Sequence, residues 1–473
     1  MLFLSGKTAR GFAVATSIVE LALTVVIFTQ YRRGIQMVDR INDWIPADSI
    51  RVDYFLSVDG ISAPLVLLTG VLGLVAVFAS WNLTLRLKEH FAWLLVLQGA
   101  VIGVFTSMDF FLFFLFWELE LIPMFLLISI WGSGRKEYSA MKFLIFTILG
   151  SAFMLVGILA LYFSTGTFDM SILPQKIPQA DLLIPASWIF ILTIIGFAVK
   201  LPVFPLHTWL PDAHTDAPTA ASVMLAGVLL KMGGYGMLRV SAGMFPEQLQ
   251  YFAWVIAILA VINIIYGAAI TIRQTDLKRL IAYSSVSHMG FVLLGLSSVA
   301  TINVSPLGMT GAALQMFTHG TITGLLFLTV GFVYEKTHSR HIPDLGGLAR
   351  RMPFLSVSLV IAGLASLGLP GTSGFVSEIT IFLGSFSAWK IPTLIATAGV
   401  VLTAGYILWM IQRTILGPLP DKYRRLNDAS LPEMIPIAIL TLTIIVVGIY
   451  PAFISDAFGE GISPIIQSIR LAN

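Results

Sequence analysis

The chain has 473 residues, of which 57% are hydrophobic and only 11% are charged. Soluble globular proteins carry about 25% charged residues, so this composition excludes a soluble domain and predicts a polytopic α-helical membrane protein. The sequence contains no cysteine, which excludes disulfides and cysteine-ligated iron–sulfur clusters within this chain. The small net charge of +3 gives no indication of nucleic-acid binding.

Apolar stretches long enough to cross a bilayer recur along the sequence. The first stretch follows a short charged N-terminal segment, and no small-residue cleavage site is evident. We therefore expect a retained helix and not a signal peptide. A shorter apolar piece, 377–389, follows Pro370 and is expected to be the second half of the span that begins near residue 354. The thirteen candidate spans are 11–31, 61–81, 91–107, 109–131, 141–163, 182–206, 219–243, 250–272, 278–299, 310–334, 354–374, 393–416 and 434–455.

Lysine and arginine are shared unevenly between the two sides of these spans. The side of the amino terminus holds eighteen of the 28, the other side holds eight, and Lys200 and Lys231 lie inside spans. Because positive charge accumulates on the inner side of a membrane, the amino terminus is predicted inside and the carboxyl terminus outside. The membrane is expected to be a bacterial plasma membrane or an organelle inner or thylakoid membrane. The segment 32–60 is then outside and is expected to form a folded cap.

Two spans are interrupted by proline in similar sequence. Lys200-Leu-Pro202 ends one span, and Gly368-Leu-Pro370 interrupts another, five spans further along. Because five is odd, the second copy is inverted relative to the first, a plan found in transporters. We therefore expect an all-α polytopic membrane protein with two inverted five-helix repeats, each with a broken helix. The expected parts are N-terminal helices and the outer cap segment (1–90), the first repeat (91–243), the second repeat (250–416), and a C-terminal loop and last helix (417–473).

Lys200 and Lys231 flank a polar segment and lie within apolar helices. Placing an ammonium at the bilayer centre costs about 2.5–3.5 kcal/mol. Burial favours the neutral amine of a lysine, and a neighbouring carboxylate favours its ammonium form. When the two effects nearly balance, the gain or loss of one proton nearby decides whether the lysine is charged. That is the requirement for a gated proton carrier. The alternative is snorkelling to the interface, which is open to Lys200 near the end of its span but not to Lys231 midway along its own.

Glu118 and Glu120 lie midway along a phenylalanine-rich span. Residues two positions apart on a helix point about 200° apart, so only one of them faces an interior lysine. The spacing leaves the choice open. We select Glu118, which directly follows Trp117, as the partner of a lysine. The alternative role of such a pair is a purely structural buried ion pair.

Three more titratable residues lie inside predicted spans. Glu378 follows the break at Pro370 and is expected to be either a proton site or a helix cap. His288 and His319 titrate near neutral pH and are candidates for a proton relay, with nearby serine and threonine to hold water. The alternatives are histidines satisfied by a hydroxyl group or, without any other supporting signal, ligands to haem.

A polar segment joins the helices of the two lysines. Its residues match no standard zinc pattern and are expected to seal the broken helix. No nucleotide-binding or hydrolytic motif occurs in a supporting context. The driving force for ion movement must therefore come from a partner or a gradient. The polar residues of the segment are His207, Asp212, His214 and Asp216.

Four motifs together carry a family resemblance over nearly the whole chain. They are WELELIPMFLLISIWG, KLPVFPLHTWLPDAHTDAPTAASVMLAGVLLKMGGYGMLR, RLIAYSSVSHMG and LPGTSGFVSE. The chain resembles the antiporter-like membrane subunits of proton-pumping NADH:quinone oxidoreductase, respiratory complex I, and the glutamate in its second broken helix is typical of the subunit M branch. The resemblance implies that Glu118 pairs with Lys200, that Lys231 is the central proton site and Glu378 the terminal one, and that His288 and His319 lie between the half-channels.

The resemblance also implies partners and cofactors. NADH, FMN, iron–sulfur clusters and quinone are expected in partner subunits and not in this chain, and two related antiporter-like chains are expected beside it. The family has fourteen spans with both ends outside, so its first helix is expected to be missing here. The hypothesis is a proton-translocating subunit that couples quinone reduction elsewhere to proton transfer. The alternatives are a subunit of a sodium/proton antiporter or membrane-bound hydrogenase, a structural membrane scaffold, and a solute carrier.

Overall fold

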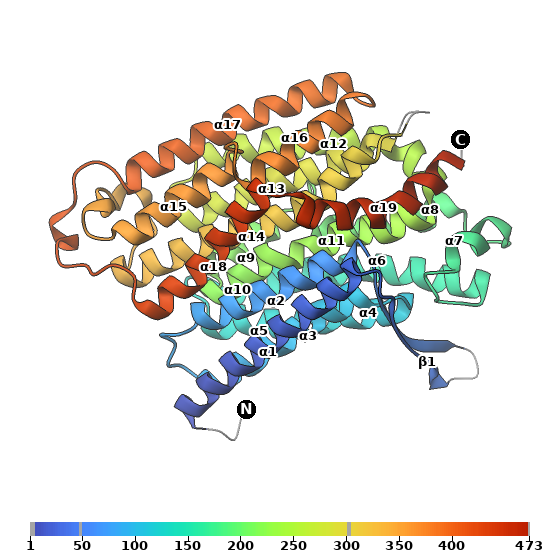
Figure 1. Ribbon diagram of the computed structural model, residues 1–473, viewed down its shortest axis with the longest axis horizontal. Helices are drawn as coiled ribbons and strands as arrows, with labels where there is room; N and C mark the ends of the chain where they lie inside the picture. The colour runs from blue at the N-terminus through green and yellow to red at the C-terminus, as the bar shows by residue number, and fades with distance from the viewer. Residues whose placement is uncertain (1–4, 47–49, 300–303, 472–473) are drawn as a thin grey trace.

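The long helices run roughly side by side in one bundle (Figure 1). The structure is a computed structural model that describes residues 5–46, 50–299 and 304–471. The N-terminus lies at one end of the bundle, and a β-hairpin projects from the opposite end (Figure 1). We refer to these two ends as the N-terminal face and the hairpin face.

Eleven helical spans of the described residues are long and apolar enough to cross a membrane. They are α1 (Gly6–Arg32), α2 (Ser62–Ala79), α3 (Leu87–Thr106), α4 with α5 (Phe110–Leu119 and Leu121–Trp131), α6 (Lys136–Thr165), α10 to η3 (Thr219–Ala242), α12 (Pro246–Ile272), α13 with η4 (Leu277–Leu296 and Ser297–Val299), α14 (Pro306–Thr337), α17 (Lys390–Thr414) and α18 (Leu431–Ile449). The prediction of a polytopic helical membrane protein is thus confirmed.

Three further apolar helices are too short to cross a bilayer alone: α8 (Ala186–Lys200), α15 (Pro353–Ser366) and α16 (Ser373–Phe386). The count of thirteen spans, the inverted repeats and the four parts of the chain therefore stay predictions. The remaining helices are α7 (Leu173–Lys176), η1 (Ile177–Gln179), α9 (Trp209–Asp216), η5 (Ile342–Asp344), η6 (Leu348–Arg350), η7 (Asp421–Tyr423) and α19 (Ala452–Leu471).

The core lies among four spans. The most apolar windows of α14 and of Thr219–Ala242 are fully buried, and those of α13 and α2 are buried over 94% and 89% of their length. The window of α1 is only 22% buried, as expected for a helix whose other side meets lipid or another chain. Lys231, His288 and His319, which lie in these inner spans, are therefore enclosed by protein.

Three helices break inside the bundle. The span predicted at 109–131 is not continuous, because α4 ends before Glu120 and α5 begins after it. The span predicted at 182–206 ends as a helix at Lys200, and the break predicted at Pro370 separates α15 from α16. Within Thr219–Ala242, π-helical segments at Leu225–Leu229 (η2) and Met237–Ala242 (η3) flank α11 (Leu230–Gly236). Breaks and π-segments release backbone carbonyls from the regular helical ladder.

The end of the chain differs from the prediction of a last helix at 434–455. Helix α18 ends at Ile449, and α19 begins after Pro451, because proline cannot continue the hydrogen bonding of the preceding helix. One side of α19 buries Ile454, Phe458, Ile462 and Ile469, and the helix contacts α14. This amphipathic helix was not distinguished from the preceding span, because its apolar residues do not form a continuous run.

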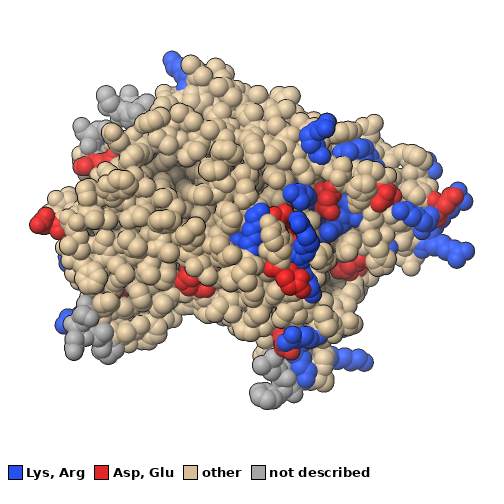
Figure 2. All heavy atoms as spheres, turned by 180° about the vertical axis from the view of Figure 1, so that it is seen from behind, with Lys and Arg blue, Asp and Glu red and all other residues tan. Residues whose placement is uncertain are grey.

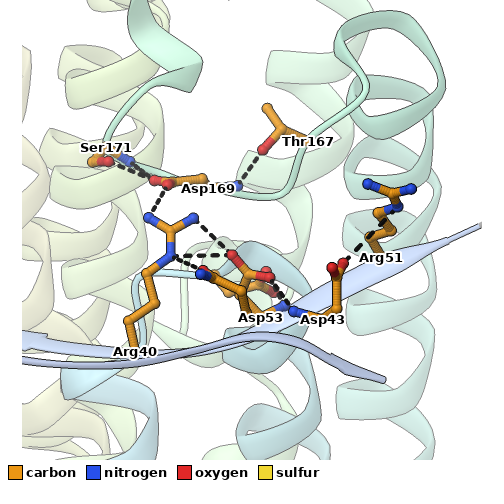
Figure 3. Close-up of polar contacts among 9 residues, drawn as sticks. Arg40, Asp43, Arg51, Asp53, Thr167, Asp169 and Ser171 are labelled. Atoms are coloured by element: carbon orange, nitrogen blue, oxygen red, sulfur yellow. Dashed lines mark hydrogen bonds and ion pairs between the residues drawn. The ribbon is translucent and has the colours of Figure 1, made fainter. Parts of the chain in front are cut away.

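The cap predicted at 32–60 is a two-stranded antiparallel hairpin of β1 (Met37–Pro46) and β2 (Arg51–Val58). Arg40 holds it to the bundle: its guanidinium lies 2.6 Å from Asp53 on the hairpin and 2.8 Å from Asp169 after α6 (Figure 3). Asp169 is in turn fixed by Ser171, which donates to it from both its backbone and its hydroxyl group. The hairpin is therefore an integral part of the hairpin face.

The base of the hairpin is anchored to the core by a second ion pair. Asp59 follows β2 and accepts hydrogen bonds from the backbone of Ile61 and Ser62 at the start of α2. The Arg239 guanidinium lies 2.6 Å from the Asp59 carboxylate. Burial alone would raise the pKa of Asp59, but this guanidinium and the backbone donors hold the pKa below its usual range.

Charge is concentrated at the N-terminal face. Figure 2 shows Lys and Arg side chains gathered at the right-hand end, which is the end of the N-terminus after the half-turn from Figure 1. This distribution agrees with the uneven lysine and arginine count, and the assignment of this face to the inner side of the membrane stays a prediction.

Candidate functional site

Lys200 is the last residue of α8, and its ammonium forms an ion pair with the carboxylate of Glu120 at the break between α4 and α5. Both side chains are buried, with exposed fractions of 1% and 0%. The rings of Trp117 and Phe143 lie 5.5 Å and 5.4 Å from the Lys200 nitrogen, within range of a cation–π attraction. The C-terminal end of α8 also favours a cation. The surroundings therefore favour a charged lysine as long as the carboxylate stays in place.

The prediction that Glu118 is the residue in contact with Lys200 is wrong. The helix is interrupted at Glu120, whose carboxylate contacts Lys200, whereas the Glu118 side chain is only half-buried and forms no ion pair among the described residues. The signal that was missed is Pro123, which has no N–H for the carbonyl of Leu119 and so disrupts a regular helix there. Glu118 remains within electrostatic reach of Lys200, as a second carboxylate beside the pair.

Lys231 lies in α11 between the two π-helical segments and is completely buried. Its amino group donates to the carbonyl of Ala226 in the first π-segment. It also lies 2.7 Å from Nδ1 of His319 on α14. A hydrogen bond between an ammonium and a ring nitrogen needs a neutral imidazole that accepts at that nitrogen. Lys231 is thus placed to give a proton directly to His319.

His319 is followed by His288 and Glu378. The rings of His319 and His288 have centroids 5.7 Å apart. Nδ1 of His288 lies 3.4 Å from the Glu378 carboxylate, and its Nε2 lies 3.2 Å from the hydroxyl of Ser366. All of these side chains are buried. Four titratable residues on four helices thus form one series in the order Lys231, His319, His288, Glu378, which we call the buried line.

A small cavity lies beside the second half of the buried line. Its volume is about 10 Å³, and it is lined by His288, His319, Glu378, Gln315 and Ser366, among others. That volume is close to the minimum needed for one water molecule, and its lining offers the polar partners that a buried water requires. A single water could therefore bridge the two histidines or the carboxylate, where the direct contacts are longest.

The break between α15 and α16 positions the Glu378 carboxylate. Glu378 lies in the second turn of α16, and its Oε2 lies 2.9 Å from the position that a Cβ on Gly368 would occupy. Gly368 has a φ of +79°, which favours glycine, so a side chain there would be strained and would crowd the carboxylate. The glycine at the break therefore leaves room for Glu378 beside the released backbone.

The two lysine sites are joined by close helix packing. A Cβ on Gly233 of α11 would lie 2.6 Å from the carbonyl oxygen of Phe197 and 2.7 Å from the backbone nitrogen of Leu201. Helices α8 and α11 are therefore in backbone contact next to Lys200 and two residues from Lys231. Such contact transmits a displacement of one helix to the other.

The polar segment between the lysines ties α9 to its neighbours. Asp212 lies 2.7 Å from the amino group of Lys142 and 3.6 Å from the guanidinium of Arg279, and Asp216 accepts a hydrogen bond from Ser139. In the part of the chain that the structure describes, no group of three or more His, Cys, Asp or Glu is placed to hold a metal ion. These contacts agree with the predicted seal over the broken helix.

Comparison with known proteins identifies relatives over nearly the full chain. Residues 107–404 match the family described as NADH:quinone oxidoreductase/Mrp antiporter, transmembrane. NAD(P)H-quinone oxidoreductase chain 4 1 of Synechococcus elongatus is 43% identical over 468 residues, which are 96% of this chain and 85% of that protein. NADH-quinone oxidoreductase subunit M of Rhodobacter capsulatus is 39% identical over 476 residues, which are 98% of this chain and 91% of that protein.

A solved structure shares the fold. A chain in respiratory complex I from Thermus thermophilus with bound NADH superposes with a TM-score of 0.87 at 26% sequence identity. The match covers 98% of the present chain and 95% of the other. The matched family and this structure agree on a multi-pass membrane protein from a multisubunit complex.

Proposed function

Because the chain belongs to the NADH:quinone oxidoreductase/Mrp antiporter transmembrane family, we propose that it is a proton-translocating membrane subunit of an NADH:quinone oxidoreductase. The observation that supports this function most strongly is the buried line, in which Lys231, His319, His288 and Glu378 follow one another without an intervening apolar layer. Ionisable groups in the interior of a membrane protein mark proton or ion pathways, since their burial is otherwise unfavourable.

The first step of the proposed mechanism takes place at the Glu120–Lys200 pair. A conformational or electrostatic signal from quinone reduction in other subunits separates the two charges, with Glu118 as the second carboxylate that Lys200 can approach. Two unit charges about 4 Å apart interact by about 4 kcal/mol at an effective dielectric constant of 20. An uncompensated Lys200 then repels the charge on Lys231, which lies on α11, the helix packed against α8.

The second step moves a proton along the buried line. Lys231 gives its proton to Nδ1 of His319, which lies 2.7 Å away, and becomes a neutral amine. The proton passes to His288 and then to Glu378, from which it leaves on the hairpin face. The alternative for these residues is a hydroxyl-bonded structural role, and the bond of His288 to Ser366 shows that such a partner is present. The contact of His288 with Glu378 on its other nitrogen favours the relay.

The chain acts without a redox group of its own in this proposal. NADH, FMN, iron–sulfur clusters and quinone belong to partner subunits, and two related antiporter-like chains are among the membrane partners. The N-terminal face is the inner side of a bacterial plasma membrane or of an organelle inner or thylakoid membrane.

A subunit of an Mrp-type antiporter is the second candidate, because the family description includes both systems. Co-purified flavin and iron–sulfur subunits would decide for the oxidoreductase.

The test is Lys231→Met in the assembled complex in inside-out membrane vesicles. NADH oxidation and vesicle acidification are measured together, with assembly checked on native gels. We expect a loss of acidification per NADH oxidised, because the line loses its first proton carrier. Lys422→Met, at an exposed lysine of the N-terminal face, is the matched control and should pump normally. Full acidification by an assembled Lys231→Met complex would contradict the proposed function.

A further inference from the structure

The buried line begins at Lys231, which has no exposed surface, so protons need an entrance from the N-terminal face. A cavity of about 520 Å³ lies at that face, between the ends of α2, α5 and α14 and the beginnings of α3, α10, α13 and α18. We call it the N-face cavity. Its volume is sufficient for many water molecules.

The outer part of the N-face cavity carries two carboxylates. Glu433, at the start of α18, lies 3.0 Å from the amino group of Lys336 and is held by a capping box with Ser430. Asn82 donates to Glu335 over 3.1 Å and to Glu433 over 3.4 Å. The contacts join the ends of α2 and α14 to the start of α18. Carboxylates fixed at a cavity wall raise the local concentration of protons and other cations.

The inner wall holds a lysine without a carboxylate partner. Lys278, in the first turn of α13, is 3% exposed and donates to the carbonyl of Ala217 over 2.7 Å. No ion pair of Lys278 occurs among the described residues. His90, which is 1% exposed, also lines the cavity, and its Nδ1 has no hydrogen-bond partner in the described part of the chain. Buried polar atoms of this kind call for water in the cavity.

His214 connects this wall to Lys231. It lies one turn before Ala217 and is fully buried, and neither ring nitrogen has a hydrogen-bond partner among the described residues. Its ring lies flat against Phe327 of α14, with centroids 4.4 Å apart and planes at 10°. Phe327 lies about two turns along α14 from His319, the partner of Lys231. His214 thus stands between the N-face cavity and the start of the buried line.

We propose that the N-face cavity is the entrance for protons to the buried line, with Lys278 as the residue that passes them inward. Lys278 gives a proton toward His214 and is recharged by a proton from the cavity, so each transfer moves one proton and leaves the lysine as it was. Glu335 and Glu433 supply the cavity from the N-terminal face. This inference rests on the proposed function and adds the place of uptake.

The absence of cysteine from the chain allows a direct test of the cavity. Ser133→Cys places a thiol on the wall of the N-face cavity, and Asn427→Cys places one at an exposed position of the same face outside it. Inside-out vesicles of the whole complex are treated with a positively charged methanethiosulfonate, and acidification per NADH oxidised is measured. Treated wild-type vesicles control for cysteines in other subunits. We expect a loss for Ser133→Cys that a thiol reductant reverses, and none for Asn427→Cys.

The chemical role of Lys278 is tested separately. Lys278→Met should lower acidification per NADH in assembled complexes, whereas Lys422→Met should not. Complete labelling of Ser133→Cys with unchanged acidification would overturn the entrance, and so would normal pumping by Lys278→Met. If Lys231→Met lost acidification while labelled Ser133→Cys or Lys278→Met kept it, only the proposed entrance would be contradicted. Normal pumping by Lys231→Met would instead contradict the proposed function itself.

Discussion

At the scale of single residues, the Glu120–Lys200 pair is the feature in which structural and functional roles are hardest to separate. Both side chains are almost completely buried, and each leaves the other uncompensated if removed. Breaking a buried ion pair on one side destabilises a protein by about 3–5 kcal/mol, while replacing both partners by apolar residues is often neutral. This asymmetry gives a way to distinguish the two roles.

Glu120→Leu should therefore reduce assembly of the complex, and the double variant Glu120→Leu/Lys200→Met should restore it. The restored complex should still fail to acidify vesicles, because it lacks the pair whose separation starts the proposed cycle. Native gels measure assembly, and acidification per NADH measures pumping. A double variant that assembles and pumps fully would assign the pair a structural role alone.

Residue identities could be predicted only in part. Lys231, His288, His319 and Glu378 were recognised because each is ionisable within a long apolar stretch, and the structure places them side by side. The spacing leaves the choice between Glu118 and Glu120 open, and the family resemblance favours Glu118. The interruption of the helix at Glu120 becomes visible only in the structure. Neither Ser366 nor Lys278 could be placed beside a partner without the tertiary fold.

At the scale of elements, the contact between α8 and α11 should be sensitive to the size of one side chain. Gly233→Ala places a methyl group within 2.6–2.7 Å of two backbone atoms around Lys200, so the helices must separate. We expect a destabilisation of about 1–3 kcal/mol, typical of overpacking. A Cβ at Gly243 would meet no atom closer than 3.7 Å, so Gly243→Ala is the matched control.

Thermal denaturation of the purified complex and acidification per NADH are the measurements. Gly233→Ala should lower both, and Gly243→Ala should lower neither. Equal behaviour of the two variants would show that close packing of the lysine helices has no part in stability or coupling.

The main helices were predictable from apolar length, but their interruptions were predictable only where a proline marks them. Pro370 marked the break before α16 correctly, because proline has a direct local effect. The π-segments around Lys231 carry no such marker, since Leu225–Leu229 and Met237–Ala242 have ordinary helical compositions. The hairpin at 37–58 was expected only as a cap, because its polar contacts with Asp169 depend on a segment more than a hundred residues away.

At the scale of the whole molecule, composition and hydropathy settle the class of fold, and the arrangement of helices decides which charges meet. The innermost spans are those that carry Lys231, His288 and His319, whereas α1 faces outward over most of its length. We therefore propose one continuous route across the bundle, from the N-face cavity through the buried line to Glu378. If the residues act in series, the effects of two substitutions on acidification do not add, whereas the effects at two independent sites would add.

The most direct test of that route is acidification per NADH oxidised in assembled complexes with Lys231→Met, His319→Leu and the two changes combined. If the residues act in series, each single variant loses acidification, and the double variant loses no more than Lys231→Met alone. Full acidification by His319→Leu, or a further loss in the double variant, would contradict the continuous line.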